Sequence, residues 1–231
     1  MKNYKLLIFD LDNTIIDYDK AELESLKYIY NKFFCKNTSF EVMINEFKVI
    51  NLNLWVKYQN SDISIEELRI QRFRQLADLF KIQFSIFEIK HEYETQVGQR
   101  VYLFDGALSF LQYVKMSYKL CIVSNGISSI QYKKINSFGL NKIFNKIYIS
   151  EDVGFQKPNP KIFEIALLEF SIKPENTLMI GDSLSSDLLG AKNANIDFCW
   201  FNINKYNFDY EYPSPNFIVE SYIELKQLLH V

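Results

Sequence analysis

The sequence has few cysteines and no excess of charge. Its three cysteines, Cys35, Cys121 and Cys199, are an odd number in apolar surroundings and form no CxxC pair. They therefore indicate neither a disulfide framework nor a metal site, and no histidine cluster offers a zinc site instead. The 26 basic and 28 acidic residues nearly cancel, which excludes the positive field needed to bind a nucleic acid polymer.

Long apolar runs are missing as well. The run before Asp10 is too short for a signal peptide, and no stretch approaches the length that crosses a membrane. We therefore expect a cytoplasmic protein without a membrane partner. Hydrophobic residues make up 48% of the chain and aromatic residues 16%, which excludes a disordered or fibrous protein. With 231 residues, the chain exceeds a typical domain of about 100–150 and can hold an inserted module.

The segment from Leu6 to Phe9 is apolar throughout and is followed by two carboxylates, Asp10 and Asp12. Such a run is typical of a strand buried on both faces in the middle of a parallel sheet. Ligands bind at the carboxyl ends of strands in open α/β sheets, so Asp10 is expected at a chemically active edge. A strand end followed by a turn at Asp12 and Asn13 is an equally good explanation of this segment alone.

Residues 17–98 show only helical patterns. Apolar residues recur at helical spacing from Leu23 to Phe33 between charged positions. Capping boxes are predicted at Thr38, Ser64 and Ser85, each with a glutamate three residues later. No strand-like run interrupts these segments, so the region is predicted to be helical throughout.

This organisation predicts two domains. We expect a core domain formed by residues 1–16 and 99–231, and a cap domain of residues 17–98 inserted directly after the first strand. The inserted module could be a purely structural bundle. Its attachment by both ends beside Asp10 favours a lid over the active edge of the sheet.

Beyond Asp105, short apolar strands alternate with helices. Strands are predicted over 120–123, 147–149, 177–180, 197–201 and near 216–219, and helices over 107–117, 127–138, 161–170, 184–194 and from 221. This alternation indicates an α/β fold with a doubly wound parallel Rossmann-like sheet, interrupted by the inserted all-helical cap domain.

Polar side chains follow four of the predicted strands. They are Asp10 and Asp12 after the first, Ser124 and Asn125 after the second, Lys157 beyond the third, and Asp182 and Asp187 after the fourth. Because parallel strands end at the same edge of the sheet, we expect these groups to meet. Carboxylate oxygens suit Mg²⁺. Three carboxylates in a partly dry cleft repel one another, so a divalent cation and the Lys157 ammonium would be needed to balance them.

These segments resemble the haloacid dehalogenase-like (HAD) superfamily of phosphatases over the whole chain. The superfamily's four motifs stand here as the DxDxT segment Asp10 to Thr14, as Ser124, as Lys157, and as the GDxxxxD segment Gly181 to Asp187. The helical insertion is similar to the small mobile cap of one group of these enzymes. Ser124 to Gly126 and Gly154 to Pro158 resemble the 5′-nucleotidases that act on nucleoside monophosphates.

The resemblance implies a role for each motif residue. Asp10 is the expected nucleophile, which forms an aspartyl phosphate, and Asp12 is the expected general acid and base. Mg²⁺ is the expected cofactor. Its ligands would be Asp10, Asp182 and the backbone carbonyl of Asp12, with Asp187 holding a metal-bound water or Lys157. Ser124, the N–H of Asn125 and Lys157 would bind the transferring phosphoryl group.

The motif residues recognise a phosphoryl group and not the alcohol attached to it, so discrimination is expected from the cap. Trp55 and Arg72 are the candidate specificity residues. Each has a plainer explanation, because Trp55 could anchor the helix bundle and arginines on helices are mostly solvated. Phe73, beside Arg72, is expected in the core.

We therefore expect a Mg²⁺-dependent phosphatase that acts on a small phosphate monoester, specifically a nucleoside 5′-monophosphate, as a monomer or homodimer. Alternatives are a sugar-phosphate phosphatase, a phosphomutase similar to the β-phosphoglucomutases, and a phosphonatase with a cap lysine. A dehalogenase would lack the second acid of the first motif, so Asp12 argues against it. A non-enzymatic phosphate-binding protein would normally have lost Asp10 or Asp12.

Overall fold

The computed structural model describes residues 3–230 and forms two compact units. The core unit comprises Met1–Asp17 and Tyr102–Val231, and the helical unit comprises Tyr18–Val101. Within the described residues, no helix combines the length and the apolar character needed to cross a membrane.

The described part of the core unit holds a six-stranded parallel sheet. Its strands are β1 (Leu6–Phe9), β2 (Lys119–Ser124), β3 (Lys146–Ile149), β4 (Thr177–Gly181), β5 (Asp197–Phe201) and β6 (Phe217–Val219). The strand order is β3-β2-β1-β4-β5-β6, so β1 lies between β2 and β4 and is buried along its length. The connections reverse direction between β1 and β4, which is the switch point where ligands bind in open α/β sheets.

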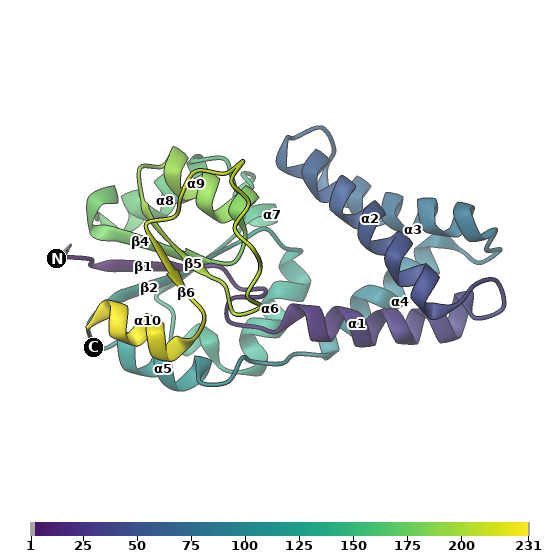
Figure 1. Cartoon of the computed structure of the whole chain (residues 1–231), viewed down its shortest axis with the longest axis horizontal. Helices are drawn as coiled ribbons and strands as arrows, with labels where there is room; N and C mark the ends of the chain where they lie inside the picture. The colour runs from purple at the N-terminus through teal and green to yellow at the C-terminus, as the bar shows by residue number, and fades with distance from the viewer. Residues whose placement is uncertain (1–2, 231) are drawn as a thin grey trace. The chain divides into compact units, whose positions relative to one another are not determined.

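Helices cover both faces of this sheet (Figure 1). They are α5 (Ala107–Val114), α6 (Ser128–Ser137), α7 (Ser150–Val153), α8 (Lys161–Phe170), α9 (Leu189–Asn193) and α10 (Tyr222–Leu229). On the face covered by α8 and α9, Phe163 packs in one buried cluster with Ile8 and Met179. On the face covered by α5 and α10, the Phe9 ring lies 6.4 Å from the Phe110 ring. Ile8 and Phe9, successive residues of β1, thus pack into hydrophobic cores on opposite faces of the sheet.

The predicted doubly wound α/β class is confirmed, and the differences lie in the bounds of strands and helices and in short helical turns. The helices predicted over 161–170 and 127–138 are α8 and α6. The helix predicted over 107–117 ends at Val114, because the Val114 carbonyl accepts from both Ser117 and Tyr118 in a turn that leads into β2. The described part of the core unit also contains three short helical turns: Leu140–Lys142, Pro174–Asn176 and the π-helical turn Leu184–Leu188. The helix predicted over 184–194 is therefore this π-helical turn followed by α9.

The helical unit consists of α1 (Tyr18–Ile29), a π-helical turn (Tyr30–Phe34), α2 (Phe40–Gln59), α3 (Ile65–Phe80) and α4 (Ile86–Gln99). The capping box predicted at Ser64 is confirmed, with Ser64 and Glu67 exchanging hydrogen bonds at the start of α3. This reciprocal pair satisfies two backbone N–H groups that a helix start otherwise leaves unpaired.

The two other predicted capping boxes are wrong. Ser39, and not Thr38, caps α2 and accepts from the Val42 N–H at 3.3 Å. With Ser39 as the N-cap, the third residue of the helix is Val42. A capping box needs a glutamate or glutamine there, whose side chain accepts from the N-cap N–H. Ser85 precedes α4 without a side-chain capping bond, and the carboxylate of Glu88 instead lies 3.7 Å from the Lys32 ammonium.

Candidate active site

Asp10 lies at the carboxyl end of β1, at the switch point of the sheet. Its N–H donates to the Ile180 carbonyl of β4 at 2.9 Å, so the sheet pairing extends to the carboxylate itself. Asp182 follows β4 directly. One oxygen each of Asp10, Asp182 and Asp187 falls within a group whose members are all within 4.8 Å of one another. The parallel register of β1 and β4 therefore brings Asp10 beside Asp182 and Asp187, which are far from it in the sequence.

A tight turn after Asp10 brings Asp12 back toward the same edge. The Leu11 carbonyl accepts from the N–H groups of Ile15 and Ile16 at 3.0 and 2.9 Å, and Asn13 adopts a φ of 55°. Asparagine tolerates this left-handed conformation better than most residues. The turn that the sequence suggested at Asp12 and Asn13 is therefore present, and it returns the chain toward the end of β1.

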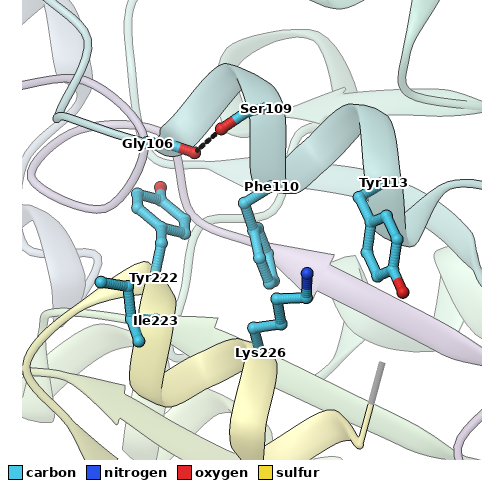
Figure 2. A pocket seen from close by; sticks show the side chains of 7 residues that line it. All are labelled: Gly106, Ser109, Phe110, Tyr113, Tyr222, Ile223 and Lys226. Atoms are coloured by element: carbon cyan, nitrogen blue, oxygen red, sulfur yellow. Dashed lines mark hydrogen bonds between the residues drawn. The ribbon is translucent and has the colours of Figure 1, made fainter.

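Helix α10 contacts the segment that follows Asp12 through a side-chain hydrogen bond. The Tyr222 hydroxyl donates to the Thr14 carbonyl at 2.6 Å. Tyr222 and Phe110 have ring centroids 5.0 Å apart and line a hollow of about 250 Å³ between α5 and α10 (Figure 2). None of the residues labelled in Figure 2 is a predicted site residue, and Tyr113 and Ile223 are exposed, so this hollow lies at the surface.

Lys157 carries its ammonium into the carboxylate cluster. The Nζ donates to Asp10 Oδ1 at 2.5 Å and to the Val123 carbonyl at 2.8 Å, and it lies 2.7 Å from Asp187 Oδ1. The Asn125 side chain holds the backbone at Lys157 with two bonds, donating to its carbonyl and accepting from its N–H, each at 2.7 Å. Sequence reasoning assigned Asn125 only through its backbone N–H and missed this clamp.

The spacing of Gly181 and Asp187 has a steric reason. Asp187 is fully buried, and its Oδ2 accepts from the Ser183 N–H at 3.1 Å. This bond folds the side chain back over the end of β4. A Cβ at position 181 would overlap the Asp187 carboxylate, so only glycine leaves room for it. Beside them, the Trp200 indole donates to the Asp182 carbonyl at 2.8 Å.

Burial dominates the electrostatics of this cluster. It raises the pKa of Asp10 to about 7, with Lys157 opposing the rise and Asp187 supporting it. Burial, followed by the charges of Asp10 and Asp187, raises the pKa of Asp182 well above its ordinary value. For Lys157 burial alone would lower the pKa, but the carboxylates of Asp10 and Asp187 raise it above its ordinary value. One ammonium therefore faces three carboxyl groups, and ionisation of all three would leave an excess of negative charge.

These groups fit a divalent cation. The donor set consists of hard carboxylate oxygens, which Mg²⁺ prefers. Asp187 Oδ1 is buried and accepts no aligned hydrogen bond among the described residues, although the Lys157 ammonium is close. An incompletely satisfied buried oxygen and an excess of negative charge are both relieved by a bound cation.

Sequence reasoning missed two buried polar residues of α6, Gln131 and Lys134. Gln131 donates to Asp12 Oδ2 at 2.9 Å and to Ser124 Oγ at 2.7 Å, and Lys134 donates to Asp12 Oδ1 at 2.6 Å. The sequence does contain a signal, since both residues are polar at helical spacing with the buried Ile130 and Ile135.

The two candidate specificity residues lie in the helical unit and differ in accessibility. Trp55 is partly buried, with its ring 5.7 Å from the Tyr58 ring. Arg72 is only 3% exposed, and its guanidinium lies 4.6 Å from the Tyr93 ring. Arg72 is thus not a solvated helix residue, whereas Phe73 is buried as expected.

The comparison with known families agrees with this geometry. Together, the doubly wound sheet and the carboxylate cluster at its switch point define an α/β protein with an aspartate-rich site. A model of the haloacid dehalogenase-like hydrolase family matches residues 7–201, a span that contains every predicted motif residue. The chain belongs to the haloacid dehalogenase-like hydrolase family, as its resemblance implied.

Three relatives match nearly the whole chain. YfnB of Bacillus subtilis (strain 168) is 32% identical over 203 residues, which cover 87% of this chain and 86% of YfnB. A crystal structure of YfnB bound to magnesium matches with a TM-score of 0.90, 29% identity and 100% of both chains covered. The pyrimidine 5′-nucleotidase YjjG of Escherichia coli (strain K12) is 31% identical over 226 residues, 96% of each chain. A glyceraldehyde 3-phosphate phosphatase of Pyrococcus furiosus is 32% identical over 240 residues, covering 100% of this chain and 94% of the relative.

Proposed function

We propose that this hydrolase is a Mg²⁺-dependent phosphoric monoester hydrolase that works through an aspartyl phosphate on Asp10. The observation that carries the proposal is the buried Asp10 carboxylate at the switch point, 2.5 Å from the Lys157 ammonium and beside Asp182 and Asp187. Uncatalysed hydrolysis of phosphate monoesters is among the slowest reactions known, with enzymatic accelerations of up to ~10²¹, so division into two steps through a covalent intermediate is favourable.

The reaction has two halves. In the first, an oxygen of Asp10 attacks phosphorus, the bond from phosphorus to the alcohol oxygen breaks, and Asp12 gives its proton to the departing alcohol. In the second, Asp12 takes a proton from water, the water oxygen attacks phosphorus, and Asp10 is released with inorganic phosphate. Ser124, the Asn125 N–H and Lys157 bind the phosphoryl oxygens in both halves.

Mg²⁺ would be held by the carboxylates of Asp10 and Asp182 and by the Asp12 backbone carbonyl, with Asp187 behind them. When bound, the ion neutralises charge on the phosphoryl oxygens. Lys157 complements it from within the protein, because its ammonium is buried and fixed by Asp10 and the Val123 carbonyl. The magnesium bound in the YfnB crystal structure supports this proposal.

For the substrate we propose a nucleoside 5′-monophosphate. The similarity to a pyrimidine 5′-nucleotidase supports this class, and the similarity to a glyceraldehyde 3-phosphate phosphatase supports a sugar phosphate as the second candidate. We propose that residues 17–98 act as a cap that selects the alcohol, with Trp55 and Arg72 as candidate specificity residues. Trp55 is the more accessible of the two, and stacking of a base on an aromatic ring contributes ~1–3 kcal/mol.

The test is phosphate release from a panel of nucleoside monophosphates, triose and hexose phosphates and p-nitrophenyl phosphate, with Mg²⁺ and with EDTA. We expect the highest kcat/KM for a nucleoside monophosphate and complete loss in EDTA. Undiminished turnover in EDTA would contradict the metal-dependent mechanism. A preference for triose or hexose phosphates would favour the sugar phosphatase, and isomerisation of a sugar phosphate without phosphate release would indicate a phosphomutase.

A further inference from the structure

A buried glutamine bridges the expected acid and base to the expected phosphoryl-binding hydroxyl. Gln131 is 1% exposed, and its Nε2 donates both to Asp12 Oδ2 at 2.9 Å and to Ser124 Oγ at 2.7 Å. Asp12 follows β1, whereas Ser124 ends β2. One side-chain amide on α6 therefore connects two of the motif segments.

The chemistry of these groups fixes the direction of each hydrogen bond. A carboxylate only accepts, so the amide must present its NH₂ group to Asp12. The second N–H hydrogen then goes to Ser124, whose oxygen accepts it. Among the described residues Ser124 Oγ has no other hydrogen-bond partner. Its own hydrogen is thus left to be donated to a phosphoryl oxygen.

Lys134 occupies the other oxygen of the same carboxylate. Its Nζ donates to Asp12 Oδ1 at 2.6 Å, and its side chain is 2% exposed. Gln131 and Lys134 lie three residues apart on α6, so they project from the same face of the helix. Together they bind both carboxylate oxygens of Asp12, which restricts rotation of that group.

The local structure fixes α6 in place for this task. A Cβ at position 126 would overlap the Gln131 side chain, so Gly126 lets the amide lie directly against the backbone. At the start of the helix, the Ser128 N–H donates to Glu151 at 2.7 Å and its hydroxyl donates to Asp152 at 2.6 Å. Both acidic residues belong to α7, so α6 is tied to a neighbouring element at the end nearest Gln131.

We propose that Gln131 and Lys134 are positioning residues for the hydrolytic reaction. They hold the Asp12 carboxyl where it exchanges its proton with the leaving alcohol and with water, and Gln131 also directs the Ser124 hydroxyl hydrogen to the phosphoryl group. This inference rests on the proposed function, because it assigns residues that act through Asp12 and Ser124.

The first test uses the leaving group. Gln131→Met and Lys134→Met approximate the shape of each side chain but donate no hydrogen bond, and Lys133→Met on the exposed side of α6 is the matched control. Proton donation by a general acid contributes ~10²–10⁴-fold and matters most for a poor leaving group. We expect Gln131→Met and Lys134→Met to lower kcat for an alkyl phosphate at least about tenfold more than kcat for p-nitrophenyl phosphate, and Lys133→Met to lower both less than about twofold.

A second test separates the two residues. Gln131 donates to the Ser124 hydroxyl, whereas Lys134 donates to Asp12, so Gln131→Met should raise the inhibition constant of inorganic phosphate severalfold while Lys134→Met leaves it near the wild-type value. Lys134→Arg retains a cationic donor and should recover most of the activity lost in Lys134→Met.

The opposite results are equally clear. Equal losses on both substrates, or unchanged kinetics in Gln131→Met and Lys134→Met, would overturn the inference while an active wild type upholds the proposed function. A Gln131→Met protein that fails to fold would leave the comparison of Lys134→Met with Lys134→Arg to decide. A wild type that hydrolyses no phosphate monoester would overturn the proposed function itself, and this inference with it.

Discussion

Asp10 is the residue on which the charge balance of the cluster depends. The residue is 7% exposed, and its pKa of about 7 reflects burial first, with Lys157 opposing and Asp187 reinforcing the shift. At neutral pH and without a cation, the group is thus close to its own titration. A nucleophile must be ionised, so catalysis and stability make opposite demands on this position.

Asp10→Asn separates these two demands. We expect it to abolish phosphate release, because an amide is a poor nucleophile, and to leave the metal-free unfolding temperature at pH 8 at or above the wild-type value, because a neutral amide is buried at lower cost. Steady-state assays and thermal unfolding measure the two effects, with exposed Asp62→Asn as the control. A clearly lower unfolding temperature would show that the ion pair with Lys157 outweighs the burial of the carboxylate.

Lys157 should show the opposite behaviour. Lys157→Met removes the buried ammonium and leaves Asp10 and Asp187 facing each other, and removal of one partner of a buried ion pair costs about 3–5 kcal/mol. We expect loss of activity and a decrease of this size in the free energy of unfolding, measured by urea denaturation in EDTA. Exposed Lys133→Met should change that free energy by less than about 0.5 kcal/mol. Equal stability of the two variants would contradict the charge balance described here.

At the scale of elements, most of the fold could be predicted from the sequence. Strands buried on both faces are apolar throughout, and in each crossover helix apolar residues recur at helical spacing. Strand 197–201 and helix 161–170 have the predicted bounds. Residues expected at strand ends, such as Asp10 and Asp182, do converge because parallel register brings them to one edge. Gln131 could not be predicted as their neighbour, since its contacts depend on how α6 packs after the chain leaves β2.

The helical unit shows the same limit at its helix starts. The spacing of Ser and Glu predicts a capping box equally at Ser64 and at Ser85, but only Ser64 forms one. Glu88 lies near Lys32 instead, and this tertiary contact cannot be read from the local sequence.

This difference gives a matched pair of variants. Ser64→Ala removes a formed capping box and should lower the free energy of unfolding by about 1 kcal/mol, the usual cost of losing such a cap. Ser85→Ala removes no capping bond and should change it by less than about 0.5 kcal/mol. Both serines are exposed, so packing contributes little to either value. Urea denaturation of the two variants decides, and a larger loss for Ser85→Ala would show that α4 begins differently in solution.

At the scale of the whole molecule, the core unit is organised around a cluster that is unfavourable on its own. The sheet places Asp10, Asp182 and Asp187 within one small group, where burial raises the pKa of Asp10 and Asp182. A cluster of this kind lowers the stability of the metal-free protein at pH values where the unfolded chain would have these carboxyls ionised. The proposed cation would reverse that effect by binding only the folded state.

The resulting pH dependence has a definite sign. Folding raises the pKa of Asp10 from its ordinary value of 3.8 to about 7, so between these values the folded protein binds more protons than the unfolded chain. The contribution of Asp10 to the free energy of unfolding therefore falls as pH rises through this window. Asp182 acts in the same direction, because burial also raises its pKa. Lys157 has its shift above an ordinary value of 10.5 and does not contribute in this range.

We therefore expect the unfolding temperature of the metal-free wild type to fall between pH 5 and pH 8 relative to that of Asp10→Asn, which lacks the titrating carboxyl. Addition of Mg²⁺ should raise the wild-type unfolding temperature more at pH 8 than at pH 5, because the ion binds ionised carboxylates. Calorimetry of both proteins, with EDTA and with Mg²⁺, measures the two effects. Parallel pH profiles for wild type and Asp10→Asn would show that Asp10 has an ordinary pKa in the folded protein. A Mg²⁺ effect of equal size at both pH values would place the ion away from the carboxylates of Asp10 and Asp182.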